Sequence, residues 1–141
     1  MNIDVARNMI KEAGDCLEEA ERAYSKLSYN LSVRRAQETV ELSMKGILRL
    51  IGIEYPKKHD VGDVFIEQMM KYSQDIDVLE KISEISLRLT KEREASFYME
   101  RLYSEATARE AVDGALFVYE YAEKLLRNAD EMRGNKLRII F

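Results

Sequence analysis

The stretch TAREAVDGALFVYEYAEKLLRNADEM, residues 107–132, decides the fold class of this chain. Its small and aliphatic residues recur three or four positions apart, at Ala108, Ala111, Ala115, Val118, Ala122, Leu125, Ala129 and Met132. An α-helix completes a turn every ~3.6 residues, so this spacing lines them up on one face. Thr107 and Glu110 fit a capping box at the start, and Gly134 is typical of a helix end. We therefore predict a long amphipathic helix here.

A stripe of the same kind runs along the N-terminal segment. Its members are Ile3, Ala6, Ile10, Ala13, Leu17, Ala20, Tyr24 and Leu27. We predict a helix over this stretch, with an acidic opposite face in solvent. Alanine is abundant on this helix and on the one at 107–132, so the two can approach closely as antiparallel neighbours.

A turn at residues 28–30, which includes Asn30, separates the first helix from the next apolar stripe. That stripe comprises Val33, Ala36, Val40, Met44, Ile47 and Ile51. Ser32 is a natural N-cap for the helix that it predicts, and Gly52 is a natural stop.

The middle of the chain predicts two further helices. After a turn at Pro56, Asp60 is placed to cap a short helix that bears Val61, Val64, Phe65 and Met69. Another helix is predicted to start near Asp75 and to bear Leu79, Ile82, Ile85, Leu87 and Leu89. The pattern weakens after residue 90 and leaves the structure of 91–103 open.

These elements predict an all-α fold, a four-to-five-helix up-and-down bundle. We expect a single domain at 1–134, because single cores usually serve about 100 to 200 residues. The apolar and basic tail at 135–141 is either an extended docking segment or a frayed end.

Composition limits the classes of function. Lys and Arg number 22 against 26 Asp and Glu, a net charge of −4. The chain thus lacks the general basic excess that favours non-specific binding to phosphate backbones, although a local basic patch stays possible. We expect no cofactor and no metal, because one His, one Cys and scattered carboxylates lack ligand spacing.

The same composition predicts a cytoplasmic protein. Cys16 is the only cysteine and has no partner for an internal disulfide, so we expect a reduced thiol in the core. No apolar run approaches the ~18 residues of a membrane span, so we expect no membrane contact.

The segment AQETVELSMKGIL at 36–48, with Gly52 and then PKKHDV at 56–61, resembles HEPN domains. In that family a helix with a Gln-rich apolar face and a Lys leads through a Gly to a turn with Pro and His. REASFY at 93–98 and TAREA at 107–111 are similar to the family's Arg, aromatic pair and entry into the last helix. The resemblance covers about residues 4–126 and depends on the order of Gln37, Lys45, Gly52, Pro56, His59, Arg93, Tyr98 and Thr107.

This resemblance implies a stand-alone prokaryotic helical domain that forms a homodimer. It also implies a partner, because many HEPN domains pair with a small nucleotidyltransferase in toxin–antitoxin systems, and several are metal-independent ribonucleases. The catalytic members carry an Arg followed a few residues later by a His, an arrangement that is missing here. The only histidine is His59, and the nearest arginine before it is Arg49. We therefore expect a nucleotide- or RNA-binding interaction module, with an endoribonuclease toxin of non-standard site or a ligand-free structural bundle as alternatives.

His59 and Arg93 are the catalytic candidates. Cleavage of RNA needs a group that moves a proton near neutral pH, which His does best, and a cation to steady the developing charge. The plain structural alternative for His59 is a turn residue that caps a helix end or stacks on Tyr55. For Arg93 the alternative is an ordinary charged helix end.

The candidates for binding a nucleotide or RNA are Lys45, Arg93, Tyr98 and Arg101. An Arg and an aromatic residue one to two helical turns apart can together hold a phosphate and stack a base. For Lys45, the alternative is a buried stem with its ammonium in solvent. Arg34 and Arg35 can join such a cleft, or pair with the acidic residues Glu38 and Glu41.

Overall fold

The structure is a computed structural model that describes residues 3–55, 57, 61–73, 75–97 and 101–131, with only the backbone of 93–97. These residues form α1 (Ile3–Ser25), α2 (Tyr29–Leu50), α3 (Gly62–Met69), α4 (Ile76–Phe97) and α5 (Glu105–Glu131), and no strand occurs among them. The all-α prediction is confirmed. The charged run at 91–97, which the pattern left open, continues α4.

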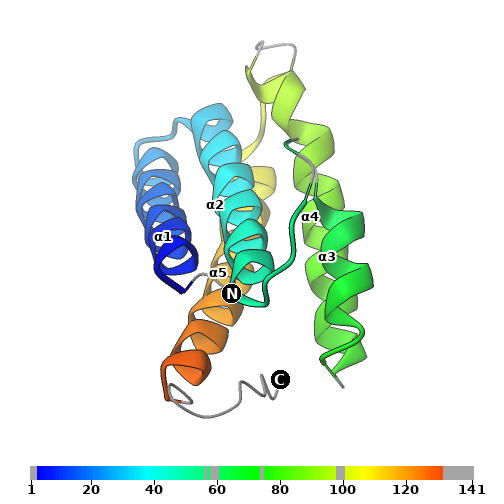
Figure 1. Cartoon of the computed structure of the whole chain (residues 1–141). Coiled ribbons are helices and arrows are strands. Elements are labelled where there is room, and N and C mark those ends of the chain that lie inside the picture. The colour runs from blue at the N-terminus through cyan, green and yellow to red at the C-terminus, as the bar shows by residue number, and fades with distance from the viewer. Residues whose placement is uncertain (1–2, 56, 58–60, 74, 98–100, 132–141) are drawn as a thin grey trace.

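The helices α1, α2, α4 and α5 run alternately up and down, as predicted (Figure 1). The central helix is α2, which contacts all the others and has α1 and α4 on opposite sides. Its apolar stripe is buried from Val33 to Ile47, while Ile51 follows the helix and is partly buried. The polar residues Ser32, Gln37, Thr39, Glu41 and Ser43 are buried too. Burial on several faces is typical of a helix in the centre of a core, against which the other helices pack.

Small residues let the N-terminal hairpin close tightly. A Cβ added at Gly46 of α2 would lie 2.7 Å from Ile10 Cγ1 of α1, so the two helices pack at a distance that only glycine allows there. The stripes of α1 and α5 are largely buried, from Ala6 to Ala20 and from Ala108 to Ala129, and Ala23 of α1 is buried as well. Cys16, predicted to lie in the core, is half-buried at its edge.

One member of the predicted α1 stripe lies elsewhere. Leu27 follows the helix in a left-handed conformation, with φ of 64°, and its side chain is 72% exposed. The Ser28 N–H donates to the Ala23 carbonyl at 2.8 Å, and the Leu27 N–H donates to the Tyr24 carbonyl at 3.0 Å. This pair of bonds is the Schellman helix ending, in which the left-handed residue is usually glycine. The predicted place of Leu27 in the stripe is therefore wrong.

The same ending closes α2, as predicted from Gly52. Gly52 has φ of 80°, its N–H donates to the Arg49 carbonyl, and the Ile53 N–H donates to the Leu48 carbonyl at 2.9 Å. The chain then leaves the helix sharply, because a left-handed residue reverses its direction.

Two predicted N-caps are wrong. Ser32 lies inside α2 and is buried, because its hydroxyl donates to the Ala20 carbonyl of α1 at 2.9 Å. Helix α5 begins before Thr107, whose N–H donates to the Ser104 hydroxyl at 3.2 Å. Ser104 is therefore the cap, and the Thr107–Glu110 capping box is not the start of the helix.

The two helices of the middle segment largely follow the prediction. Helix α4 starts next to Asp75 as expected, and the Asp75 carboxylate caps it by accepting the Val78 N–H at 3.2 Å. Leu87, however, is 54% exposed and outside the core. Asp60 lies outside the described residues, as does the tail 135–141, and Val61 occupies the N-cap position of α3. None of the helices in the described ranges is long and apolar enough to cross a membrane.

Candidate functional site

One concavity lies where the α1–α2 turn meets the segment that enters α5. This cavity, the head cleft, has a volume of about 470 Å³. It is lined by Leu27, Ser28, Tyr29, Asn30, Leu31, Arg34, Leu102 and Tyr103. Apolar, aromatic and cationic groups therefore converge at one end of the bundle.

Asn30 holds the two sides of the head cleft together. Its side-chain amide donates to the Arg101 carbonyl at 2.6 Å, and its side-chain oxygen accepts the Tyr103 N–H at 3.0 Å. One side chain thus replaces the regular backbone bonds that the segment at 101–103 lacks. The backbone on both sides of Leu102 is fixed to the start of α2.

Tyr103 connects the same segment to α4. Its hydroxyl donates to the Glu92 carbonyl at 3.0 Å, and its side chain is buried. The guanidinium of Arg101 lies 5.4 Å from the centre of the Tyr103 ring and 3.4 Å from the Glu92 carboxylate. Because the Arg101 side chain is still 61% exposed, it keeps donors available to an anion.

An aromatic row continues from the cleft toward α5. The rings of Tyr29 and Tyr24 lie 5.9 Å apart, and the Arg109 guanidinium lies 5.5 Å from the Tyr24 ring. The Tyr24 hydroxyl donates to the Glu105 carboxylate at 2.9 Å. Arginines 34, 101 and 109 are therefore grouped with tyrosines 24, 29 and 103 at this end of the molecule.

These tyrosines are hydrogen-bond donors at neutral pH. Burial raises the pKa of Tyr103 to about 12, and nearby Glu92 adds to the effect. The hydrogen bond to Glu105 raises the pKa of Tyr24. A phenol with a raised pKa remains protonated near pH 7, so neither can act as a general base there.

The structure brings together only some of the residues predicted from sequence. Arg101 does not line the head cleft but lies next to two residues that do, since its carbonyl accepts from Asn30 and its guanidinium lies by the Tyr103 ring. The backbone of Arg93 follows Glu92 on the turn of α4 that bonds to Tyr103. The side chain of Arg93, together with Tyr98 and His59, lies outside the described residues.

Lys45 belongs to a different part of the molecule. It is sixteen residues beyond Tyr29 on α2, ~24 Å along the axis at 1.5 Å per residue. Its ammonium lies 2.9 Å from the buried Glu41 carboxylate and 5.9 Å from the centre of the Tyr55 ring. The geometry matches that of a structural ion pair, and its side chain is only 18% exposed.

Arg34 and Arg35 separate as their helical positions require. Arg34 lines the head cleft. Arg35 points toward α1, where it pairs with Glu19 at 3.1 Å and with Glu38 at 3.0 Å. Glu38 also lies beside Cys16, and burial together with this carboxylate raises the pKa of the thiol to about 11.

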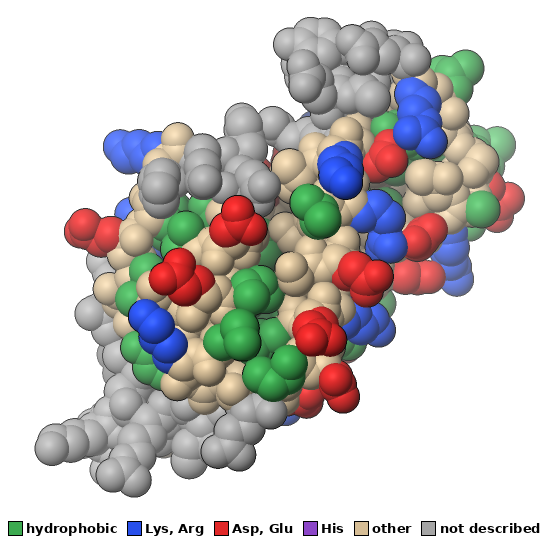
Figure 2. Space-filling view, turned by 90° about the vertical axis from the view of Figure 1, so that its right-hand side faces the viewer, with side chains coloured by type: hydrophobic (Ala, Val, Ile, Leu, Met, Phe, Trp, Pro, Cys, Tyr) green, Lys and Arg blue, Asp and Glu red, His purple; other side chains and the backbone are tan. Residues whose placement is uncertain are grey.

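No broad basic surface accompanies the site on the side of α3 and α4. Figure 2 shows that acidic, basic and apolar side chains alternate over this face. Within the described ranges, no group of three or more His, Cys, Asp or Glu residues is arranged to hold a metal ion.

Comparison with known proteins identifies one family. A family model described as HEPN domain matches residues 6–130, which is most of the chain. Neither the curated proteins nor the solved structures give a match.

Proposed function

The chain belongs to the HEPN family, and from this premise we propose that it is a cytoplasmic module that binds RNA or a nucleotide at the head cleft without cleaving it. The family supports a nucleotide-binding or ribonuclease type of domain.

The observation that carries the proposal is an exposed arginine on an anchored backbone beside aromatic rings. Asn30 fixes the backbone of Arg101, so a phosphate bound by its guanidinium costs little further ordering of the chain. Tyr29 lines the adjoining head cleft and offers a ring to a base. Stacking of a base on such a ring contributes ~1–3 kcal/mol, and a guanidinium can bind two phosphate oxygens at once.

Two further facts favour binding over cleavage. Tyr103 and Tyr24 stay protonated near pH 7, with their hydroxyls donating to Glu92 and Glu105, so they cannot accept the proton of a ribose hydroxyl. In addition, His59 does not follow an arginine at the spacing found in the catalytic members of the family.

Binding is tested with a labelled single-stranded RNA oligonucleotide and, separately, with a mononucleotide, by fluorescence anisotropy and calorimetry. Arg101→Ala should weaken binding by about tenfold, since one charged contact is worth ~1–3 kcal/mol. Lys11→Ala is the matched control, because Lys11 is an exposed cation on α1 that pairs only with its neighbour Asp15 among the described residues. Equal affinity of the wild type and Arg101→Ala would reject the head cleft as the site.

Cleavage is tested on the same RNA with purified protein. We expect the RNA to stay intact. Cleavage that disappears in His59→Ala or in Arg93→Ala would replace the proposal with an endoribonuclease of non-standard site.

We also propose a homodimer that covers the edge of the head cleft. Leu27 and Leu102 line the cleft and are 72% and 81% exposed, the most exposed of the large hydrophobic residues in the described part of the chain. Apolar side chains gathered at one place favour a protein contact, and a two-fold contact would use the same patch on both copies. Light scattering should give twice the chain mass, and Leu102→Asp should give the mass of one chain. A monomeric wild type at working concentration would contradict the homodimer.

The pairing with a small nucleotidyltransferase, in a toxin–antitoxin-like system, is a proposal supported by family membership. Co-expression with a nucleotidyltransferase encoded next to this chain should give a complex that survives affinity purification and gel filtration. The absence of such a neighbour, or of a complex, would remove this part of the proposal.

A further inference from the structure

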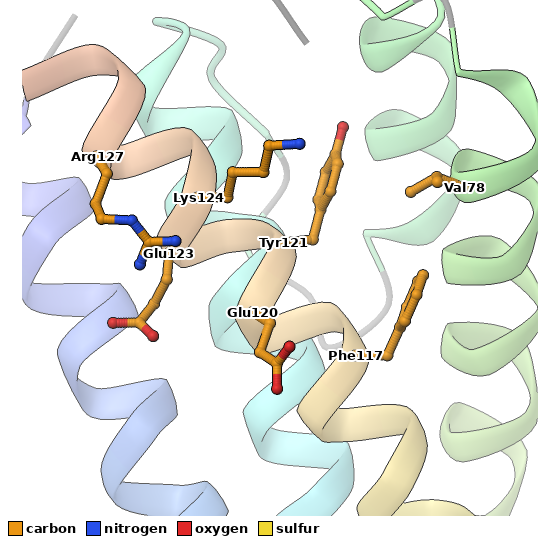
Figure 3. Close-up of a pocket in the computed structure, with 7 residues that line it drawn as sticks. All are labelled: Val78, Phe117, Glu120, Tyr121, Glu123, Lys124 and Arg127. Carbon is orange, nitrogen blue, oxygen red and sulfur yellow. The ribbon is translucent and has the colours of Figure 1, made fainter. Parts of the chain in front are cut away.

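A second concavity lies between α4 and the C-terminal half of α5, away from the head cleft. This cavity, the α5 groove, has a volume of about 580 Å³ and is lined by Val78, Phe117, Glu120, Tyr121, Glu123, Lys124 and Arg127. Figure 3 shows the rings of Phe117 and Tyr121 standing between the two helices, with Val78 pointing toward them from α4. Phe117 is twelve residues from the start of α5, ~18 Å along the helix axis, so the groove is separate from the head cleft.

The floor of the groove is apolar, and further apolar residues are exposed near the α3–α4 turn. Burial raises the pKa of Tyr121 to about 12. A hydrogen bond with Ser73 lowers this pKa and the charge of Asp75 raises it, so the α3–α4 turn lies beside the groove. That turn carries Met70, Tyr72 and Ile76, which are 55%, 44% and 41% exposed. Exposed large hydrophobic residues near an apolar cavity favour a contact with another segment or protein.

We propose that residues 135–141 of the same chain, NKLRIIF, dock in the α5 groove. The point from which this segment departs is fixed, because Asp130 in the last turn of α5 accepts two hydrogen bonds from Arg7 of α1, at 2.9 and 2.6 Å. Gly134 and Asn135 follow, and both residue types favour a reversal of the chain.

The tether has the length that this reversal needs. Tyr121 lies ten residues before Glu131 on α5, so the groove floor is ~15 Å back along the axis. The six residues from 136 to 141 span at most ~20 Å when extended. They therefore reach Tyr121 and Val78 but not the head cleft.

The residue types of the segment match the groove. In an extended chain alternate side chains face the same way, so Leu137, Ile139 and Phe141 form one apolar face, and Lys136 and Arg138 lie on the other. The apolar face suits the floor at Phe117 and Tyr121. Lys136 and Arg138 can pair with the carboxylates of Glu120 and Glu123 at the rim, which also carries the cations Lys124 and Arg127.

A tethered segment also has an advantage over a free partner. A short flexible linker gives an effective concentration of ~mM, above that of most free proteins. Docking within the chain would thus cover the groove before a second molecule could.

Disulfide trapping in the full chain tests the proposal, with Cys16→Ser as background. Val78→Cys is combined with Ile139→Cys, and the control combines Glu12→Cys with Ile139→Cys, since Glu12 is exposed on α1, on the other side of α2 from α4. Under mild oxidation the first pair should close within one chain at least about tenfold faster than the control, at a rate independent of protein concentration. Glu120→Lys, an exposed change at the rim, should slow closure of the first pair by repelling Lys136 and Arg138.

Each other outcome overturns the inference. Equal rates for the two pairs would mean that the segment does not occupy the groove. Disulfides formed mainly between chains, at a rate that rises with concentration, would assign the groove to a second copy. Circular dichroism before oxidation shows whether the variants are folded, and RNA binding at the head cleft is unaffected by either result.

Discussion

At the scale of single residues, Leu27 has the least favourable backbone in the described part of the chain. It is the one non-glycine residue there with positive φ, and its side chain gains little from burial because it is 72% exposed. A left-handed conformation costs an L-residue ~1–2 kcal/mol, whereas glycine loses ~0.5–1 kcal/mol through the entropy of the unfolded chain.

Leu27→Gly should therefore stabilise the protein by about 0.5 to 1 kcal/mol, measured by chemical denaturation. Gly52→Ala is the matched control, because Gly52 has the same position at the end of α2 and φ of 80°. It should destabilise the protein by about 1 kcal/mol. If both substitutions changed stability in the same direction, the Schellman assignment at Leu27 would be wrong.

A substitution at Lys45 can distinguish a structural role of this residue from a phosphate-binding role. Its ammonium pairs with Glu41, whose side chain is 10% exposed. Lys45→Ala leaves a carboxylate with fewer partners in a largely buried place, which should cost about 1–3 kcal/mol of stability. Glu41→Gln in the same chain should restore part of the loss, because a neutral amide is easier to bury.

RNA affinity gives the second readout for Lys45. We expect no change in Lys45→Ala at a temperature where the variant is folded, since Lys45 lies far from the head cleft along α2. A loss of affinity equal to that of Arg101→Ala, with unchanged stability, would return Lys45 to the binding site.

At the scale of elements, the joint between α2 and the segment entering α5 depends on Asn30. Asn30→Ala removes both the bond to the Arg101 carbonyl and the bond from the Tyr103 N–H. Each bond contributes ~0.5–1.5 kcal/mol, so we expect a loss of about 1–3 kcal/mol in the free energy of unfolding. RNA binding should weaken as well, because Arg101 loses its anchored backbone.

Asn30→Asp is the informative partner variant. Its carboxylate can still accept the Tyr103 N–H but cannot donate to the Arg101 carbonyl, so stability should fall between wild type and Asn30→Ala. An affinity unchanged in Asn30→Ala would show that the anchoring does not matter for binding.

The elements also show what the sequence could predict. The stripes of α1, α2 and α5 were readable because burial imposes a period of three and four along a helix. The starts of α2 and α5 were not, because several Ser and Thr residues near each start are chemically able to cap. Ser104 and Thr107 are three residues apart, and only the contacts of the folded chain select Ser104.

The candidate site was only partly predictable for a related reason. Arg101 could be proposed from its charge and its aromatic neighbours. Asn30 could be seen only as a turn residue, since its partners Arg101 and Tyr103 lie 71 and 73 positions away. Hydrophobic periodicity within one helix carries no information about contacts between residues so far apart in the sequence.

At the scale of the whole molecule, the cations near the head cleft attract RNA phosphates, whereas the net charge of −4 repels them. The cations near a bound RNA are few, chiefly Arg34, Arg101 and Arg109. For single strands, the slope of log K against log salt is ~−0.7 for each phosphate neutralised. Three contacts therefore predict a slope of about −2, which is modest for a protein that binds RNA.

This slope is the decisive test of a local site against a general basic surface. Anisotropy titrations across a range of KCl concentrations should give about −2 for the wild type and about −1.4 for Arg101→Ala, because one contact is lost. Lys11→Ala should keep the wild-type slope, since Lys11 lies away from the head cleft on α1. A wild-type slope near −5 that Arg101→Ala leaves unchanged would mean that RNA is held by many scattered cations, and the head cleft would then have no special role.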